Sequence, residues 1–361
     1  MPYKLLSIQT INPVKQRGAA LIVSLLILSI VVVIVATMTV EHNFHIRRVS
    51  NQLTASQAYS YLRATEAVAH KALQYDLEQD RDNGESADYF DELWAQEAPP
   101  FTVDNGAYTG KLYDLQARFN INSLAATLND TPQNPKAIPY SPEQGIFIRL
   151  LQSFNDDEFT ISYDQAVSIT ESLIDYIDAD QTARGFDCGE DDAYYGIEGR
   201  RPHRTADQPL ASVSELRLIC NIPVELFRRL EPHVTVWPLS GKSAININTA
   251  SVEVLRSVIV DEADVDDLKV LSPGFSVPAP LDIAQLEDFL ERQRTGYTSF
   301  STVANDLVDA ALWPSANLSL ASDYFLLSSD AKLGDVVMHL DSVFSRKAGT
   351  ISILARSTDG L

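Results

Sequence analysis

The sequence predicts an α+β fold in which a long N-terminal helix packs on an antiparallel sheet, and a large all-α insertion interrupts that sheet. Three observations lead to this prediction. No glycine or proline occurs between Ala19 and Asn83, so nothing in that stretch breaks a helix. Helical apolar spacing dominates residues 125–233, and Ser212 and Glu215 within this stretch predict a capping box. Strand-like segments separated by glycine-containing turns lie near the C-terminus.

The first apolar run, Ala19–Val40, has the length of a membrane-spanning helix. Its 22 residues include no charged side chain. As a helix they cover about 33 Å, and the hydrocarbon core of a bilayer is about 30 Å thick. Residues 1–18 contain Lys4, Lys15 and Arg17 but no acid. The positive-inside rule therefore predicts a cytoplasmic N-terminus and an exported remainder.

Three interpretations of this run compete. A Sec signal peptide needs a small-residue cleavage site after the apolar run, and Thr39-Val-Glu-His-Asn-Phe is a poor one. A plain membrane anchor remains open. The third interpretation depends on Arg17-Gly18 standing directly before the run, which resembles the signal of type IV prepilins and pseudopilins. That resemblance implies cleavage between Gly18 and Ala19. Val23 then stands at the fifth mature position, where this family usually has Glu.

Beyond the membrane run, apolar residues and many alanines continue to Asn83-Gly84, which ends the predicted helix. The helix would extend about 60 residues, or roughly 90 Å. A coiled-coil stalk is the alternative. The alanine richness and the lack of regular heptads favour packing on a sheet or on other helices.

Strands are predicted on both sides of the helical stretch. Residues 101–115 form a hairpin with its turn at Asp104-Asn105-Gly106. Residues 324–329, 336–344 and 350–356 form a meander. Phe119-Asn-Ile-Asn-Ser and Ile245-Asn-Ile-Asn-Thr are near copies, and in each the last Asn or the Ser/Thr is expected to cap a helix. The predicted division is a leader (1–18), a transmembrane segment (19–40), a spine helix with the first strands (41–124), the all-α insertion (125–233) and the remaining α/β part (234–361).

Composition excludes several functions. The formal net charge is −21, so the chain as a whole is repelled by nucleic acid. The sequence contains no glycine-rich phosphate loop, HExxH, GxSxG or C-x-x-C motif, and its six histidines form no spaced cluster. We therefore expect no enzymatic activity and no catalytic residues.

The strongest chemical signal is an acidic loop from Asp175 to Asp192, with seven carboxylates in 18 residues. Counted from Asp178, it has Ala183 and Gly189 where an EF-hand needs Gly and Glu. Carboxylates suit Ca²⁺ better than zinc or copper, and a solvated acidic loop is the alternative. A second acidic run, residues 261–267, is interpreted as a solvated face. The two cysteines, Cys188 and Cys220, form either one disulfide or two separate buried thiols.

The leader, the spine, both Asn-Ile-Asn junctions, the insertion and the terminal meander together resemble the K-type minor pseudopilins of type II secretion (the general secretion pathway protein K family). Val23 strengthens the match, because this subfamily typically lacks the Glu. The resemblance implies a pilin-like fold and structural Ca²⁺ bound in the acidic loop. The implied ligands are Asp178, Asp180, Glu190, Asp191 and Asp192, with Asp175 and Asp187 as further candidates.

The resemblance also implies a function and a location. Such a protein crosses the bacterial inner membrane once, keeps its N-terminus cytoplasmic and places the bulk of its chain in the periplasm. Prepilin peptidase cleaves it, and the new N-terminus is usually methylated. With the I- and J-type minor pseudopilins it initiates or caps the pseudopilus tip, which serves export of folded proteins across the outer membrane. Further implied partners are the major pseudopilin and the inner-membrane assembly platform.

The alternative function is a membrane-anchored helix-hairpin-helix protein for DNA binding or uptake. Residues 245–255 resemble the opening of such a unit, and Leu271-Ser-Pro-Gly-Phe faintly resembles its hairpin. Glu253, Asp261, Glu262 and Asp264 flank this region, with Arg256 and Lys269 as the nearby bases. This charge balance favours a helical scaffold without a DNA-binding role.

Overall fold

The computed structural model describes residues 17–125, 140–184, 189–190, 194, 202–265, 277–307 and 309–358. The chain divides into two units, Met1–Ala58 and Tyr59–Leu361, which are described separately.

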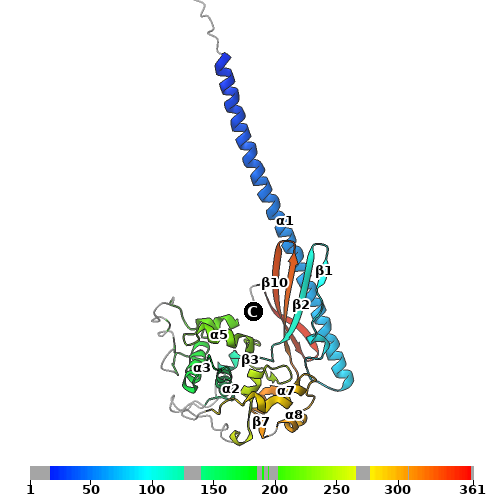
Figure 1. The fold of residues 1–361 in the computed structure, drawn as a ribbon, viewed down its shortest axis with the longest axis vertical. Coiled ribbons are helices and arrows are strands. Elements are labelled where there is room, and N and C mark those ends of the chain that lie inside the picture. The colour runs from blue at the N-terminus through cyan, green and yellow to red at the C-terminus, as the bar shows by residue number, and fades with distance from the viewer. Residues whose placement is uncertain are drawn as a thin grey trace, which may run out of the picture. The chain divides into compact units, whose positions relative to one another are not determined.

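Helix α1 (Arg17–Asn83) is continuous, and its blue N-terminal part makes up the described residues of the first unit (Figure 1). This part is long and apolar enough to cross a membrane, and its side chains are exposed from Ala19 to Leu53. Each hydroxyl in the apolar run donates to a carbonyl one turn back in the same helix: Ser24 to Ala20, Ser29 to Leu26, Thr37 to Ile34 and Thr39 to Val35. The run therefore leaves no side-chain polar group unsatisfied for a lipid environment.

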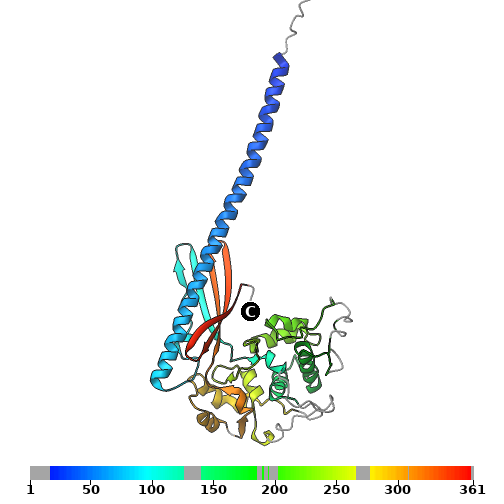
Figure 2. The same cartoon turned by 180° about the vertical axis from the view of Figure 1, so that it is seen from behind.

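The second unit contains a five-stranded antiparallel sheet in the order β1-β2-β9-β10-β11. The strands are β1 (Phe101–Val103), β2 (Gly106–Asp114), β9 (Tyr324–Leu333), β10 (Val336–Lys347) and β11 (Thr350–Ser357). Figure 2 shows the sheet from behind, with β11 in red along one edge. The hairpin turn predicted before Gly106 and the C-terminal meander are confirmed.

The C-terminal part of α1 packs on this sheet. Its Leu73 is fully buried in a cluster that includes Trp94 of η1 (Leu93–Ala95) and Phe325 and Phe344 of the sheet. Buried Glu66 adds polar contacts, because it accepts hydrogen bonds from Ser342 and Arg356 at 2.7 Å each. The predicted fold, a long N-terminal helix on an antiparallel sheet, is confirmed.

A second charged network lies where α1 ends. Arg346 donates to Asp76 of α1 and to Asp88, which is fully buried. Burial and the charge of Asp88 raise the pKa of Asp76 to about 7. Burial and nearby Asp76 raise the pKa of Glu92 to about 8, even though the Trp94 indole N–H donates to it. One arginine thus shares this site with more carboxylates than it can neutralise.

Between β2 and β9 the chain forms two helical repeats, each closed by a short parallel strand pair, β3–β4 in the first and β5–β8 in the second. The first repeat comprises β3 (Phe119–Asn120), η2 (Ile121–Ala125), α2 (Pro142–Ser153), α3 (Tyr163–Ile177), η4 (Val213–Leu218), α5 (Val224–Leu230), η5 (Glu231–His233) and β4 (Val234–Thr235). The second comprises β5 (Ile245–Asn246), α6 (Val252–Val258), β6 (Ile259–Asp261), η6 (Glu262–Asp264), η8 (Ile283–Leu286), α7 (Glu287–Gln293), α8 (Phe300–Asp306), β7 (Ala310–Leu312), η9 (Ser315–Asn317) and β8 (Leu318–Ser319).

The five-stranded sheet therefore resumes only at Tyr324, and no described residue between 115 and 323 adds a strand to it. The division predicted at residue 233 stays a prediction, since the structure separates units only after Ala58. A large helical insertion within the sheet is confirmed.

Each repeat opens with an Asn-Ile-Asn junction of the same design. Asn122 donates to the carbonyls of Leu210 and Val236 and accepts from the Leu210 N–H. Its counterpart Asn248 donates to the carbonyls of Tyr297 and Leu320 and accepts from the Tyr297 N–H. The expectation that these asparagines cap helices is wrong, because their amides tie distant chain segments together.

The caps come from serines further along. Ser141 caps α2, and Ser251 caps α6 by accepting from the Val254 N–H. The capping box predicted at Ser212 and Glu215 is confirmed, on the 3₁₀ helix η4.

Arg149 of α2 joins the two repeats. Its side chain is fully buried and donates five hydrogen bonds of 2.6–3.0 Å, all to backbone carbonyls: those of Arg256, Ser257, Ile259, Pro278 and Ala279. Burial lowers the pKa of Arg149 to about 10, so the guanidinium remains charged at neutral pH.

Candidate metal centre

The acidic loop begins at the C-terminal end of α3. A capping box of Ser162 and Gln165 starts this helix, and its apolar face packs in the core. Asp178 is the residue directly after the helix and has extended backbone angles. The chain then leaves the helix axis, so the carboxylates after Ile177 lie on a loop that a buried helix holds at one end.

Three of the predicted ligands come together. Asp178, Asp180 and Glu190 can each place one carboxylate oxygen so that all three lie within 4.8 Å of one another. Oδ1 of Asp178 and both carboxylate oxygens of Glu190 are buried without a hydrogen-bond partner. Buried acceptors without donors are costly, and a hard cation would satisfy all of them at once.

The electrostatics agree with this geometry. Burial, and next the charge of Asp180, raise the pKa of Asp178 to about 6. Burial, and next the charge of Asp175, raise the pKa of Glu190 to about 7. Without a cation these groups resist ionisation, because their charges repel in a partly desolvated site. The residues present therefore fit a divalent oxygen-seeking ion.

Asp175, a further candidate ligand, also contacts the backbone of the loop, and its role as a ligand stays a prediction. Its buried carboxylate accepts two hydrogen bonds from the Arg184 N–H, at 3.0 and 3.1 Å. A Cβ on Gly189 would lie 2.4 Å from Cβ of Ala183 and 3.3 Å from Oδ2 of Asp175. The two arms of the loop thus meet at Gly189, where only glycine fits, and Asp175 positions one of them.

Asp207 is a participant that sequence reasoning missed. Its charge contributes to the raised pKa of both Asp178 and Glu190. Thr205 donates to its Oδ1 at 2.6 Å and Gln181 to its Oδ2 at 3.1 Å. The backbone of Asp207 has a φ of +49°, in the left-handed region that Asp tolerates better than most residues. Spacing alone gave no reason to connect it with the acidic loop.

The remaining predicted loop residues, Asp187, Cys188, Asp191 and Asp192, lie outside the described part of the chain. Cys220 is described and is disulfide-bonded. Its Sγ lies 3.9 Å from the hydroxyl of Tyr194, which is buried with its ring 5.4 Å from that of Tyr176. The far end of the loop is thereby packed in the core of the first repeat.

The residues predicted for processing lie in α1. Gly18 and Ala19 are consecutive helical residues, and Val23 is exposed one turn later. The helix does not test cleavage or tip placement, so these roles stay predictions.

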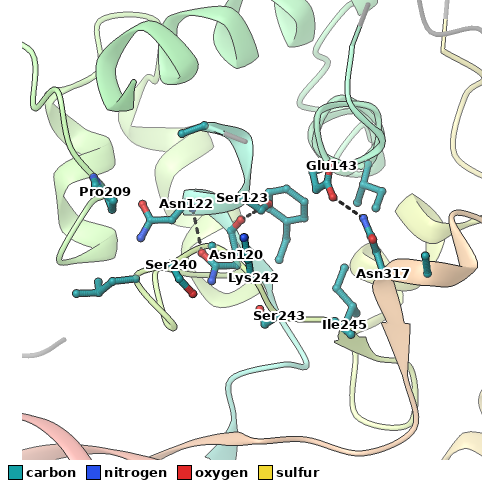
Figure 3. A pocket seen from close by; sticks show the side chains of 17 residues that line it. Asn120, Asn122, Ser123, Glu143, Pro209, Ser240, Lys242, Ser243, Ile245 and Asn317 are labelled. Carbon is teal, nitrogen blue, oxygen red and sulfur yellow. Dashed lines mark hydrogen bonds between the residues drawn. The ribbon is translucent and has the colours of Figure 1, made fainter. Parts of the chain in front are cut away.

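A cavity of about 580 Å³ lies between the two repeats (Figure 3). Phe119 and Ile146 supply apolar walls, and Glu143 accepts a hydrogen bond of 2.7 Å from Asn317. Glu143 and Lys242 are the only ionisable residues among those lining it.

Known proteins resemble this chain over nearly its whole length. A family model described as "Type II secretion system (T2SS), protein K" matches residues 117–239. Type II secretion system protein K of Aeromonas hydrophila is 31% identical over 352 residues, which are 96% of this chain and 98% of the relative. The chain belongs to the type II secretion system protein K family. The protein K of Pseudomonas aeruginosa is 30% identical, over 94% of this chain and 92% of the relative.

A solved structure shows the same fold as this chain. It is described as the crystal structure of the GspK-GspI-GspJ complex from the enterotoxigenic Escherichia coli type 2 secretion system. One chain of it aligns with a TM-score of 0.60 and 24% identity, covering 86% of this chain and 99% of that chain. The predicted family and the pilin-like α+β fold are confirmed.

The DNA-binding alternative gains no support from these relatives. Its expected hairpin, Leu271–Phe275, lies outside the described residues.

Proposed function

We propose that this chain is a minor pseudopilin that, without enzymatic activity, initiates and caps the pseudopilus tip for export of folded proteins. Membership of the protein K family carries the proposal. The neighbouring solved structure is a complex with GspI and GspJ, so we infer I- and J-type minor pseudopilins as partners here. The long apolar start of α1 supports a single-pass anchor in the inner membrane.

The proposed steps begin with insertion of Ala19–Val40, with the basic leader left in the cytoplasm. Prepilin peptidase then cleaves between Gly18 and Ala19, and the new terminus is methylated. A Glu at the fifth mature position would pair with the terminal amine of a neighbouring subunit in the dry membrane interior. Val23 offers no such acceptor, so the subunit is best placed where one neighbour is missing, at the tip. The major pseudopilin and the assembly platform would then extend the pseudopilus behind it.

N-terminal sequencing of the protein from membranes tests the first step. With the peptidase present, we expect the chain to start at Ala19, and without it at Met1. Gly18→Val should block cleavage, because the family's signal ends in Gly, while Lys15→Gln serves as a matched leader control. An uncut wild-type chain in the presence of active peptidase would contradict the proposal.

Position at the tip has its own test. Deleting this chain should abolish secretion of a folded reporter exoprotein, and the wild-type chain should restore it. Val23→Glu supplies the missing acceptor, so labelled protein should then also appear along the pseudopilus. Val23→Leu is the control that adds no carboxylate. If the labelled wild-type chain is found along the whole length of the pseudopilus, the tip role is refuted.

We also propose that Asp178, Asp180 and Glu190 hold a structural Ca²⁺, assisted by Asp191 and Asp192. The unpartnered buried oxygens of Asp178 and Glu190 support this proposal. The ion would supply positive charge that lets these carboxylates ionise together, and would fix the loop. Asp207 lies close enough to add its charge.

Thermal unfolding tests the metal centre. At about 100 times the dissociation constant, calcium should stabilise the folded state by about 2.7 kcal/mol. That corresponds to roughly 4 °C for the roughly 300 residues of Tyr59–Leu361. Glu190→Gln should remove most of this shift, while Asp157→Asn, an exposed acid outside the loop, should keep it. Equal melting temperatures with calcium and with chelator would argue against the site.

A disulfide between Cys188 and Cys220 completes the proposal. Cys220 is disulfide-bonded, and the sequence has one other cysteine. The chain-entropy model gives a bridge across such a loop roughly 3–4 kcal/mol. Peptide mapping without reductant should recover both cysteines in one linked fragment. Free thiol at Cys188 would contradict it.

A further inference from the structure

Two arginines follow the apolar run of α1, and the fold does not use them. Between Ala19 and Thr65 the sequence has one acid, Glu41, against Arg47, Arg48 and Arg63. Arg63 forms an ion pair with Glu66 at 2.9 Å. Arg47 and Arg48 are exposed, and no described residue forms an ion pair with either. In a chain with a net charge of −21, an exposed basic pair directly after the apolar run suggests an anionic ligand outside the fold.

The depth of these arginines is set by helix geometry. With a rise of 1.5 Å per residue, their Cα atoms lie about 10–12 Å beyond Val40. The head-group layer on each side of the hydrocarbon is about 5–8 Å thick. Helical side chains lean toward the N-terminus, which here is toward the membrane, and long basic side chains snorkel. Both guanidinium groups therefore reach the level of the lipid phosphates.

The rest of the helix surface at this depth agrees. Phe44 precedes the two arginines by three and four residues, so it lies on their face one turn closer to the hydrocarbon. Phe44 is 68% exposed, and exposed aromatic rings are common at membrane interfaces. An apolar anchor, an aromatic ring and a guanidinium pair follow one another outward along this face.

We propose that Arg47 and Arg48 bind the phosphates of anionic phospholipids in the leaflet where α1 emerges, and so fix the depth of the helix. The inference rests on the proposed membrane anchor. Planar guanidinium groups suit phosphate oxygens bidentately. Lys4, Lys15 and Arg17 flank the other end of the apolar run only until cleavage after Gly18 removes them. After that cleavage Arg47 and Arg48 are the arginines nearest to the apolar run, although the chain as a whole is acidic.

Electron paramagnetic resonance of spin-labelled lipids tests this inference. The full-length chain is reconstituted in phosphatidylcholine vesicles with trace spin-labelled phosphatidylglycerol or phosphatidylcholine. We expect the wild-type chain to immobilise phosphatidylglycerol preferentially. In Arg47→Gln/Arg48→Gln the preference should fall by up to about fivefold for each arginine lost. Raising the salt from about 0.05 M to about 0.5 M should weaken the wild-type preference.

The control is Lys71→Gln/Arg81→Gln, which removes two exposed charges from the same helix about 45 Å or more beyond Val40. It should keep the wild-type preference. The inference is overturned if the arginine variant keeps the preference, or if the control loses it equally. If the arginine variant keeps its preference for phosphatidylglycerol but no longer binds an acidic partner subunit, Arg47 and Arg48 contact that protein and not lipid. If the chain does not float with the vesicles, the proposed membrane anchor is refuted as well. Flotation therefore distinguishes failure of the anchor from failure of the lipid-binding inference.

Discussion

Replacing Arg149 by methionine would remove the donor that holds the two helical repeats together. Arg149 lies on α2, and its five acceptors all lie within the second repeat, 107–130 residues away. Methionine has nearly the same length and fills the space. The substitution thus removes the charge and the donors while leaving little cavity.

The expected loss in the free energy of unfolding follows from the backbone carbonyls that Arg149→Met leaves without a donor. Each buried carbonyl without a donor costs about 1 kcal/mol or more, and five are affected. Methionine recovers part of this, because it buries an apolar side chain without desolvating a charge. The net loss should be about 3–5 kcal/mol. For the roughly 300 residues of Tyr59–Leu361 it lowers the melting temperature by roughly 5–8 °C.

The assay is thermal unfolding of the full-length chain in detergent, followed by circular dichroism. Arg149→Lys should be intermediate, since an ammonium has three donors where the guanidinium uses five bonds. Arg228→Met, an exposed arginine on α5, is the control and should change stability little. A loss below about 1 kcal/mol for Arg149→Met would refute the reasoning. So would a lysine variant as stable as the wild type.

Three further outcomes are expected. The pKa values of Asp76 and Glu92 are raised, so the folded state keeps protons that the unfolded chain releases above about pH 4. Stability should therefore fall as the pH rises toward 8, and Glu92→Gln should flatten the fall measured by melting temperature. Asn122→Ala and Asn248→Ala each remove three buried hydrogen bonds and should lower the free energy of urea unfolding by about 2–3 kcal/mol. If either variant is as stable as the wild type, its asparagine does not hold distant chain segments together. Gly189→Ala should weaken calcium binding measured by calorimetry, because its Cβ has no room beside Ala183; unchanged affinity would contradict the loop geometry.

Local patterns allowed much of the fold to be predicted. The absence of breakers before Gly84 predicted α1, which ends at Asn83. The Asp104–Gly106 turn predicted the β1–β2 hairpin, and the Ser212 capping box predicted the start of η4. The turn and the capping box each depend on residues within four positions of one another, so the sequence displays the whole interaction.

The candidate metal centre was suggested in part by the sequence. The acidic loop stands out by its density of carboxylates, and the resemblance to the K-type pseudopilins implied Asp178, Asp180 and Glu190 as ligands, which the structure brings within reach of one another. Asp207 enters after a long intervening segment, and Asp175 turns to a backbone N–H. Sequence spacing predicts neither role, because each depends on which chain segments the folded structure brings next to the loop.

By itself the sequence determined the elements: the long helix, the strands, the Ser212 capping box and the oxygen-rich loop. Tertiary structure decided how they are joined. The asparagine clamps, the five carbonyls around Arg149 and the sheet closed by Leu112 against Leu327 all link residues far apart in the chain. The physical reason is that a buried polar group takes whatever partner the packed chain brings to it, and that partner has no fixed distance in sequence.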